Sequence, residues 1–195
     1  MSDPLVPVGE GHTELSEEDR FGLIPTYIAT RGELFDAEQR NIALALLRPP
    51  PTLDTLLDEM YLRDLHEAMF GQVWEWAGRY RLRETNIGID PSDISIAVRA
   101  LVEDTKAWVR YSAYDADELA IRFHHRLVAI HPFPNGNGRH SRVAANYLVQ
   151  SLGRKPFSWG AGLAVDTKGL RAAYLQSLAH ADQGEIAEMI AFARA

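Results

Sequence analysis

A short segment, residues 131–142, gathers the side chains best suited to phosphate chemistry, in the order HPFPNGNGRHSR. Gly136 and Gly138 permit a sharp turn with positive φ angles, and successive backbone N–H groups in such a turn form a nest for anions. The turn leads into a predicted helix, whose N-terminal N–H groups and positive dipole end also attract phosphate. Arg139 and Arg142 stand three positions apart, so both reach nearly the same face of that helix. The segment therefore predicts a site for a diphosphate or triphosphate.

A histidine immediately before this turn is the candidate base. The pKa of an unperturbed imidazole lies near neutrality, so His131 can take a proton from a hydroxyl group at pH 7. Beside a nest that positions a phosphorus atom, such a base predicts phosphoryl-type transfer. Phe133 is expected to anchor the loop by burying its ring. Asn135 offers a carbonyl oxygen that is a weak candidate ligand for magnesium.

Simpler interpretations exist for each of these residues. A single histidine before a proline is usually structural, and a single Gly-Asn-Gly sequence is usually only a turn. A histidine metal site is a further alternative, because four histidines lie close together in the sequence: His124, His125, His131 and His140. Adjacent residues on a helix point in different directions, however, and the chain has neither a cysteine nor an HExxH pattern. The combination of a base, two glycines and two arginines in one segment favours transfer chemistry.

The composition limits the class of protein. The chain has 195 residues, of which 46% are hydrophobic and 24% charged, as expected for a globular domain with a real core. Its net charge of −7 gives no reason to expect direct nucleic-acid binding. The absence of cysteine excludes disulfides and thiol nucleophiles. The N-terminus lacks the pattern of a secretory signal, and no apolar run is long enough to span a membrane, so a cytoplasmic location is expected.

Helical periodicity dominates the chain and predicts an all-α fold of roughly seven helices. The expected helices are residues 36–47, 53–76, 90–111, 115–130, 138–152, 166–180 and 182–193. Residues 1–15 are expected to be a loose tail and 16–52 a helical extension, before a domain at 53–195. Residues 79–90, RYRLRETNIGID, differ, since their alternation and Gly88 predict an extended segment or hairpin. Its basic cluster, RYRLR, fits a solvated surface as well as it fits a ligand site.

The segment at 131–142 resembles the motif of the Fic family, His-Pro-Phe-x-(Asp/Glu/Asn)-Gly-Asn-Gly-Arg-x-x-Arg, at every fixed position. Three further segments resemble the family: LHEAMFGQVWEWAGRYR (65–81), TNIGID (85–90) and YLQSLAHADQGEI (174–186). Residues 22–42 resemble the small bacterial Fic proteins called mobile mystery protein B. The resemblance covers about residues 53–194 and implies a Fic-type helical bundle with a short β-hairpin flap.

The resemblance also implies a function, protein adenylyl transfer. Such an enzyme moves AMP from ATP, with Mg²⁺, to a Ser, Thr or Tyr hydroxyl of a target protein, and His131 is then the base. The implied nucleotide-binding residues are Gly136, Asn137, Gly138, Arg139 and Arg142, of which Arg142 holds the γ-phosphate. The implied flap, which pairs with the target backbone as an added strand, is Thr85, Asn86, Ile87 and Gly88.

Two features leave the activity open. Asn135 stands where the family usually has a carboxylate, so a nucleotide-binding regulatory module with little catalysis, or a Fic enzyme that transfers another phosphate-containing group, remains an alternative. The family's inhibitory motif, (Ser/Thr)-x-x-x-Glu-(Gly/Asn), is approximated by residues 30–34, TRGEL, which makes Glu33 the candidate inhibitor of Arg142. Glu33 near a helix start is equally well explained as structural. Glu38 is the second choice and has the pattern of a solvated helix face. The target, the nucleotide preference and the oligomer are not specified, and a homodimer is compatible with the sequence.

Overall fold

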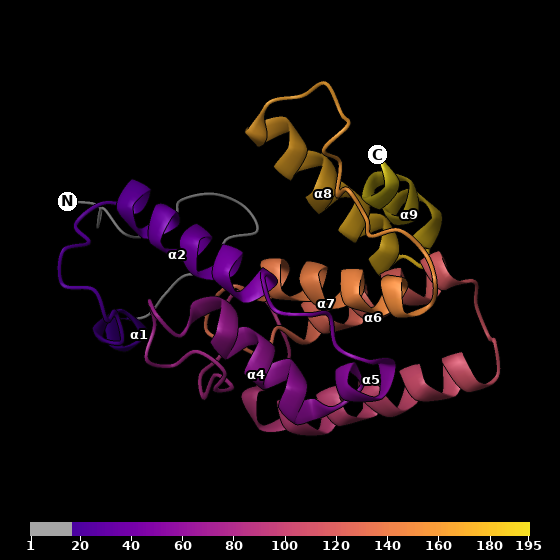
Figure 1. The fold of residues 1–195 in the computed structure, drawn as a ribbon, viewed down its shortest axis with the longest axis horizontal. Helices are drawn as coiled ribbons and strands as arrows, with labels where there is room; N and C mark the ends of the chain where they lie inside the picture. The colour runs from indigo at the N-terminus through magenta and orange to yellow at the C-terminus, as the bar shows by residue number, and fades with distance from the viewer. Residues whose placement is uncertain (1–16) are drawn as a thin grey trace.

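The computed structural model describes residues 17–195, and the expected loose tail at 1–15 lies outside them. The described part is helical and contains no strand, which confirms the all-α class (Figure 1). It has nine α-helices and one 3₁₀ helix, where roughly seven helices were expected. They are α1 (Glu17–Phe21), α2 (Arg31–Leu46), α3 (Leu53–Leu56), α4 (Glu59–Phe70), the 3₁₀ helix η1 (Pro91–Asp93), α5 (Ile94–Arg110), α6 (Ala116–Ile130), α7 (Asn137–Ser151), α8 (Thr167–Asp182) and α9 (Ile186–Arg194).

The centre of the molecule is the antiparallel pair α6 and α7, against which other helices pack (Figure 1). α6 begins as expected at Asp115, whose side chain accepts the N–H of Glu118. Its apolar stripe, with Leu119, Phe123 and Leu127, is almost completely buried. α4 and α5 lie on one side of this pair, and α8 with α9 on the other. Because α7 starts in the middle of the core, the loop before it is held from several directions.

α2 packs along α4 and so places the N-terminal extension over the start of α7. Its first turn is closed by a capping box between Thr30 and Glu33. Asn41, on its buried face, donates to the carbonyl of Ala68 and accepts the N–H of Gln72, each at 2.9 Å. These bonds satisfy backbone groups around the end of α4 and fix the register between the two helices.

Two sequence expectations need correction. The expected long helix at 53–76 is two helices, α3 and α4, and α4 ends at Phe70 with Gly71 as its C-cap. The expected β-hairpin at 79–90 is not shown, since none of these residues forms a strand. Side-chain burial explains the second correction. Arg81 is 4% exposed, whereas Leu82 is 91% exposed, so the alternation that predicted a strand does not mark a buried face.

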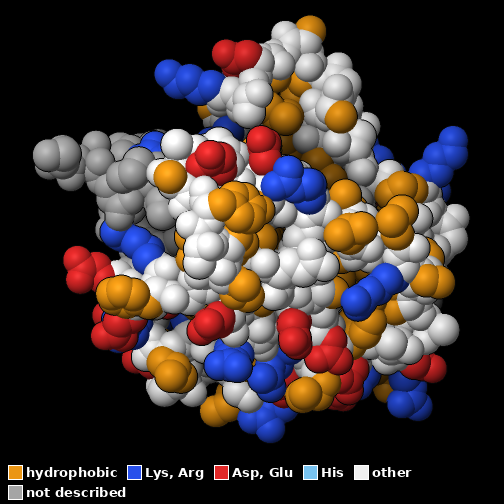
Figure 2. All heavy atoms as spheres, turned by 60° about the vertical axis from the view of Figure 1, so that its left-hand side comes forward, with side chains coloured by type: hydrophobic (Ala, Val, Ile, Leu, Met, Phe, Trp, Pro, Cys, Tyr) orange, Lys and Arg blue, Asp and Glu red, His pale blue; other side chains and the backbone are white. Residues whose placement is uncertain are grey.

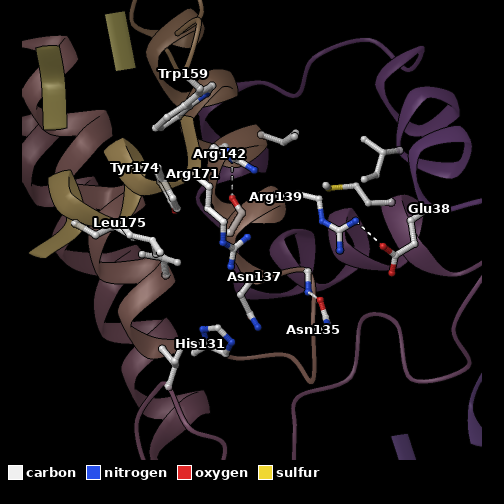
Figure 3. Close-up of a pocket in the computed structure, with 18 of the residues that line it drawn as sticks. Glu38, His131, Asn135, Asn137, Arg139, Arg142, Trp159, Arg171, Tyr174 and Leu175 are labelled. Carbon is white, nitrogen blue, oxygen red and sulfur yellow. Dashed lines mark hydrogen bonds and ion pairs between the residues drawn. The ribbon is translucent and has the colours of Figure 1, made fainter. Parts of the chain in front are cut away.

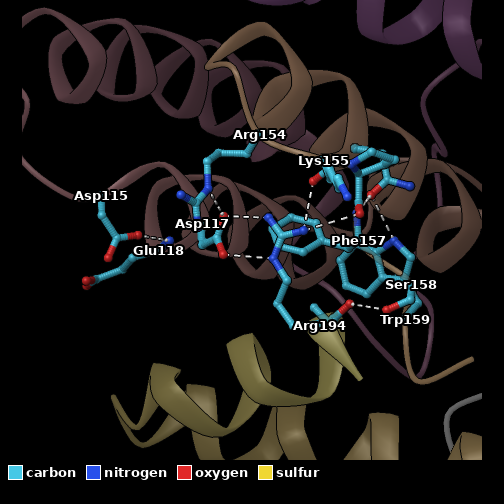
Figure 4. Close-up of polar contacts among 12 residues, drawn as sticks. Asp115, Asp117, Glu118, Arg154, Lys155, Phe157, Ser158, Trp159 and Arg194 are labelled. Carbon is cyan, nitrogen blue, oxygen red and sulfur yellow. Dashed lines mark hydrogen bonds and ion pairs between the residues drawn. The ribbon is translucent and has the colours of Figure 1, made fainter. Parts of the chain in front are cut away.

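A clasp at residue Arg194 ties the end of α9 to the start of α6 (Figure 4). The Arg194 guanidinium donates to both carboxylate oxygens of Asp117 and to the carbonyls of Lys155 and Pro156. It also lies over the ring of Phe157, 4.2 Å from its centroid. α9 in turn packs on α8, so this clasp holds the α8–α9 pair against the central helices.

The surface carries charges of both signs. On the face shown in Figure 2, acidic and basic side chains alternate over short distances, with hydrophobic side chains between them. In residues 17–195, no helix combines the length and apolar character that a membrane crossing requires.

Candidate active site

A cavity of about 1000 Å³ opens between α2, the start of α7 and α8. Residues of the 131–142 segment line its floor, among them His131, Gly138 and Arg142. α2 contributes one wall, which includes Glu38, and α8 contributes the opposite wall, which includes Tyr174 (Figure 3). The volume suits a ligand of nucleotide size.

The N-terminus of α7 meets this cavity without a side-chain cap. Its cap residue, Gly136, has φ of +80°, and a Cβ there would lie 2.7 Å from the ring of Phe70. Glycine is therefore required by both the backbone angle and the space. A Cβ on Gly138 would meet only the hydroxyl of Tyr174, at 3.7 Å. The first N–H groups of α7 are the unpaired donors that bind phosphate at helix ends.

Three side chains brace the turn from behind. Asn137 is buried, accepts the N–H of Phe133 at 2.9 Å and donates to the carbonyl of the same residue at 2.7 Å. Its side chain thus fixes the turn, and only its backbone N–H is available to a ligand. The ring of Phe133 is buried and stacks on His66 at 3.7 Å, as expected of an anchor.

His66 was not identified from the sequence, although it controls the backbone of the turn. Its Nδ1 accepts the N–H of Gly78 at 3.0 Å, which leaves the proton on Nε2 for donation to the carbonyl of Asn135, also at 3.0 Å. Burial holds the pKa of His66 well below 6.5. A neutral, buried imidazole therefore sets the orientation of the peptide that precedes Gly136.

His131 ends α6 in the left-handed conformation, with φ of +54°. It is 5% exposed yet lines the cavity. Burial lowers the pKa of His131 to about 4, the charge of Arg81 adds to this effect, and a hydrogen bond to the backbone of Val128 opposes it. The imidazole is therefore neutral at pH 7 and able to accept a proton.

The two motif arginines point in different directions (Figure 3). Arg139 reaches toward α2 and forms an ion pair with Glu38 at 2.6 Å. Arg142 stays on the side of α8, with its Nε bonded to the carbonyl of Gly138 and its guanidinium 5.2 Å from the ring centroid of Tyr174. Among the described residues, no carboxylate forms an ion pair with Arg142. Burial lowers the pKa of Arg142 from its usual value, and the side chain offers the cavity a positive charge.

The structure does not bring Glu33 to Arg142. Its carboxylate instead accepts the N–H groups of Ala29 and Thr30, each at 2.9 Å, as part of the capping box. Glu38, expected on a solvated face, is 7% exposed and accepts the indole N–H of Trp74 at 2.7 Å. The acidic residue next to the motif arginines is therefore Glu38.

The predicted flap, residues 85–88, forms no hairpin, but its Gly88 packs against His131. Ile87 lines the cavity. Gly88 has φ of +113°, and a Cβ there would lie 2.7 Å from the Cβ of His131. Thr85 closes the bend by donating from its hydroxyl to the carbonyl of Ile87. Asn86 is exposed between them.

The donors near the turn fit Mg²⁺ poorly. Mg²⁺ sites usually contain one or two carboxylates in addition to phosphates, and the side chain at the family's carboxylate position is Asn135. Its Oδ1 already accepts the N–H of Gly136. The histidine metal site is not formed either, since His124 contacts the hydroxyl of Tyr174 and His140 donates to the carbonyl of Leu62.

Arg81 and His66 are the residues that sequence reasoning missed, and Glu38 was only its second choice for the inhibitory residue. A periodic signal existed for Glu38 and His66. Glu38 stands four residues from Leu34 and four from Ile42, on the apolar stripe of α2. His66 lies on the buried stripe of α4. A charged or polar side chain on a buried stripe needs a hydrogen-bond or ion-pair partner. For Glu38 and His66 these partners, Arg139 and the backbone of Asn135, belong to the 131–142 segment.

Comparison with known proteins agrees with this geometry. Residues 56–149 match the model of the Fic/DOC family. The chain is 27% identical over 196 residues to a protein adenylyltransferase Fic from Aedes aegypti, and the match covers 94% of this chain but 37% of that protein. A protein adenylyltransferase Fic from Culex quinquefasciatus is 28% identical over 193 residues, again with 94% and 37% covered. The chain thus spans well under half the length of these relatives.

Solved structures show the same fold. The N-terminal Fic domain of a VirB-translocated Bep effector protein from Bartonella quintana, solved with bound ADP, superposes with a TM-score of 0.66 at 22% identity. That match covers 87% of this chain and 86% of the other. The BepC protein of Bartonella tribocorum, solved with bound AMPPNP, gives a TM-score of 0.68 at 17% identity, with 92% and 97% covered. With the complete motif at the start of α7, these matches lead to one conclusion: residues 56–149 form a domain of the Fic/DOC family.

Proposed function

We propose that this protein transfers AMP from ATP to a Ser, Thr or Tyr hydroxyl of a target protein. The observation that carries the proposal is the cavity in which His131, the uncapped start of α7 and Arg142 face one another. A base, a phosphate cradle and a cation are the parts that nucleotidyl transfer needs, because catalysis of such reactions is mostly positioning and charge stabilisation.

In the proposed reaction, His131 takes the proton of the target hydroxyl. The hydroxyl oxygen forms a bond to the α-phosphorus, and the bond from that phosphorus to the oxygen bridging the β-phosphate breaks. Pyrophosphate leaves, and AMP remains on the target. The low pKa of His131, about 4, keeps the base neutral before the nucleotide arrives. The negative phosphates then favour the imidazolium and raise the pKa of His131 toward neutrality, where a base is most effective.

The phosphates are assigned to the start of α7. The N–H groups of Gly138 and Arg139 take the anionic oxygens, and the buried cation of Arg142 balances charge at the far end of the triphosphate. Mg²⁺, the family's expected metal, would meet a single neutral amide oxygen at Asn135. Because this donor set fits the ion poorly, no step of the proposed mechanism depends on a metal ligand from this chain.

The flap is proposed to hold the target. Within residues 85–88, Ile87 lines the cavity and Gly88 packs against His131. Pairing of main-chain groups of this segment with the target as an added strand would place a hydroxyl by main-chain bonds. A homodimer and a cytoplasmic location remain predictions from the sequence.

Glu38 is proposed to restrain the activity. It holds Arg139 against α2, and so keeps one of the two motif arginines away from a nucleotide. In this role it replaces Glu33, the candidate from the sequence. The structure around Glu38 also leaves room for an opposite role, in which the carboxylate orients Arg139 for phosphate, and the first experiment in the Discussion separates the two.

A labelling experiment tests the function. Wild type and His131→Ala are incubated with ATP, GTP, CTP or UTP labelled at the α-phosphate, and in parallel with ATP labelled at the γ-phosphate, alone and with cell extract. We expect α-label on protein with wild type and none with His131→Ala. Transfer of γ-label in place of α-label would identify a phosphotransferase. Absence of both labels, with ATP binding retained in calorimetry, would identify the regulatory module instead.

A further inference from the structure

Arg81 is a buried arginine that joins two parts of the site. Its side chain is almost completely enclosed, with 4% of the residue exposed. Its Nε donates to the carbonyl of His131 at 2.7 Å, and its Nη2 lies 3.5 Å from the carbonyl of Ile130. The same guanidinium donates through Nη1 to the carbonyl of Arg83 at 2.8 Å and through Nη2 to the carbonyl of Ile89. One planar cation therefore binds the end of α6 and the backbone on both sides of the flap.

Arginine suits this position for electrostatic reasons. The carbonyls of Ile130 and His131 belong to the C-terminal end of α6, where the helix dipole favours a cation. Among the residues described, no carboxylate forms an ion pair with Arg81, and its guanidinium donates hydrogen bonds to backbone carbonyls. Hydrogen bonds from a charged donor are about twice as strong as neutral ones. A lysine has one nitrogen and cannot bond both groups in this planar arrangement.

Backbone contacts reinforce the connection. The N–H of Arg81 donates to the carbonyl of Pro132 at 2.9 Å, and the N–H of Ile89 donates to the carbonyl of Ile130 at 3.4 Å. A Cβ on Gly88 would lie 2.6 Å from Nη2 of Arg81 and 2.7 Å from the Cβ of His131. The flap, the guanidinium and the histidine are thus packed without space between them.

We propose that Arg81 is a positioning residue that fixes the distance and orientation between the flap and His131. This inference rests on the proposed function, in which the flap holds the target hydroxyl and His131 receives its proton. Arg81 itself touches neither the nucleotide nor the target. Arg81 holds the flap and His131 as one rigid unit, so that a hydroxyl bound to the flap lies within reach of the imidazole.

Hydrogen–deuterium exchange tests the coupling without any activity. The variants are Arg81→Lys, which keeps the charge and most of the stem, and Arg81→Gln. Arg79→Lys is the matched control, because Arg79 is exposed and two residues away. In both Arg81 variants we expect exchange in segments 82–90 and 127–133 to become about tenfold faster or more, since strong bonds to charged donors are lost. The control and the segments of α8 and α9 keep the wild-type rates.

Kinetics test the consequence for transfer. In Arg81→Lys we expect kcat for protein labelling to fall about tenfold or more, while the KM for ATP and its Kd from calorimetry stay within about twofold of the wild type. A residue that merely stabilises the fold would alter nucleotide binding and transfer together.

Each other outcome overturns the proposal. Unchanged exchange in both segments, or faster exchange in only one, shows that Arg81 does not couple them. A parallel loss of ATP binding, or loss of cooperative unfolding in Arg81→Lys, shows that the residue is a requirement of the fold. If the wild type transfers no label at all, the proposed function fails, and the exchange data still decide whether Arg81 joins the flap to His131.

Discussion

Replacement of Glu38 by glutamine tests whether Glu38 holds Arg139 away from the nucleotide or orients it for phosphate binding. The substitution keeps the size of the side chain and an oxygen for the indole of Trp74, 2.7 Å away in the wild type. It removes the charge that holds Arg139 at 2.6 Å. Arg139 is then free to turn toward the phosphates, which no longer have to displace a carboxylate.

The expected size of the effect follows from the bond that is lost. A hydrogen bond between charged groups contributes about 1.5–3 kcal/mol, and about 1.4 kcal/mol corresponds to a factor of ten in affinity. If ATP must break the Glu38–Arg139 pair, the Kd for ATP should fall about tenfold to a hundredfold in Glu38→Gln. Removal of a negative charge from the wall of the cavity acts in the same direction.

Isothermal titration calorimetry measures the Kd, and α-labelled ATP measures the rate of transfer. Glu33→Gln is the matched control, because Glu33 lies on the same helix and only closes its first turn. Glutamine can fill the same capping-box position, so this variant should keep the first turn of α2 and leave the affinity for ATP unchanged. A weaker affinity for ATP in Glu38→Gln would refute the restraint and show that Glu38 orients Arg139 for phosphate.

Three further predictions concern the metal, the turn and the response to acid. Asn135→Asp restores a carboxylate, so the Mg²⁺ concentration for half-maximal transfer should fall about tenfold; equal values in a Mg²⁺ titration would contradict this. His66→Phe keeps the stacking on Phe133 but removes both ring hydrogen bonds. Urea unfolding should therefore show a free energy of unfolding lower by about 2 kcal/mol, and calorimetry should show a weaker affinity for ATP. An unchanged affinity would disprove the role of His66 in the turn. Burial lowers the pKa of His124 to about 3 and that of His140 to about 4. Below about pH 6.5 the unfolded chain therefore binds more protons than the folded protein, and each of these histidines reduces the free energy of unfolding by about 1.4 kcal/mol per pH unit. Their full contribution to stability is present only above about pH 6.5. Equal urea midpoints at pH 7.5 and 5.5 would exclude this dependence.

Local chemistry made much of the site predictable. Asp115 and Asp166 mark helix starts, and each accepts a backbone N–H as a cap. Gly136, with its positive φ, and the ring of Phe133 also behave as expected, because turn angles and anchoring rings depend on the residues next to them. Gly138, expected to share the positive φ, lies within α7 and does not have it. The site residues that could be read from the sequence are those that belong to one short segment.

Long-range pairs were not predictable in this way. Glu38 and Arg139 are 101 residues apart, and nothing in the pattern of α2 identifies the partner. Glu33 looked more suitable because it stands near the inhibitory spacing, but its local capping bonds determine its position. Arg81 belongs to the basic cluster RYRLR, which fitted a solvated surface as well as a ligand site, so the sequence did not single it out. Its burial depends on the carbonyls at the end of α6, which lie about 50 residues away in the sequence.

The clasp at Arg194 has a consequence for the order of folding. It joins residues 77 apart, whereas α6 and α7 are neighbours along the chain and can pair early, because short loops close at lower entropic cost. The turn with the phosphate-binding N–H groups is therefore expected to form before α8 and α9 dock and complete the wall of the cavity. Pulse-labelling exchange during refolding should protect amides of α6 and α7 first. Simultaneous protection of α8 would show that the phosphate-binding turn forms only together with α8 and α9.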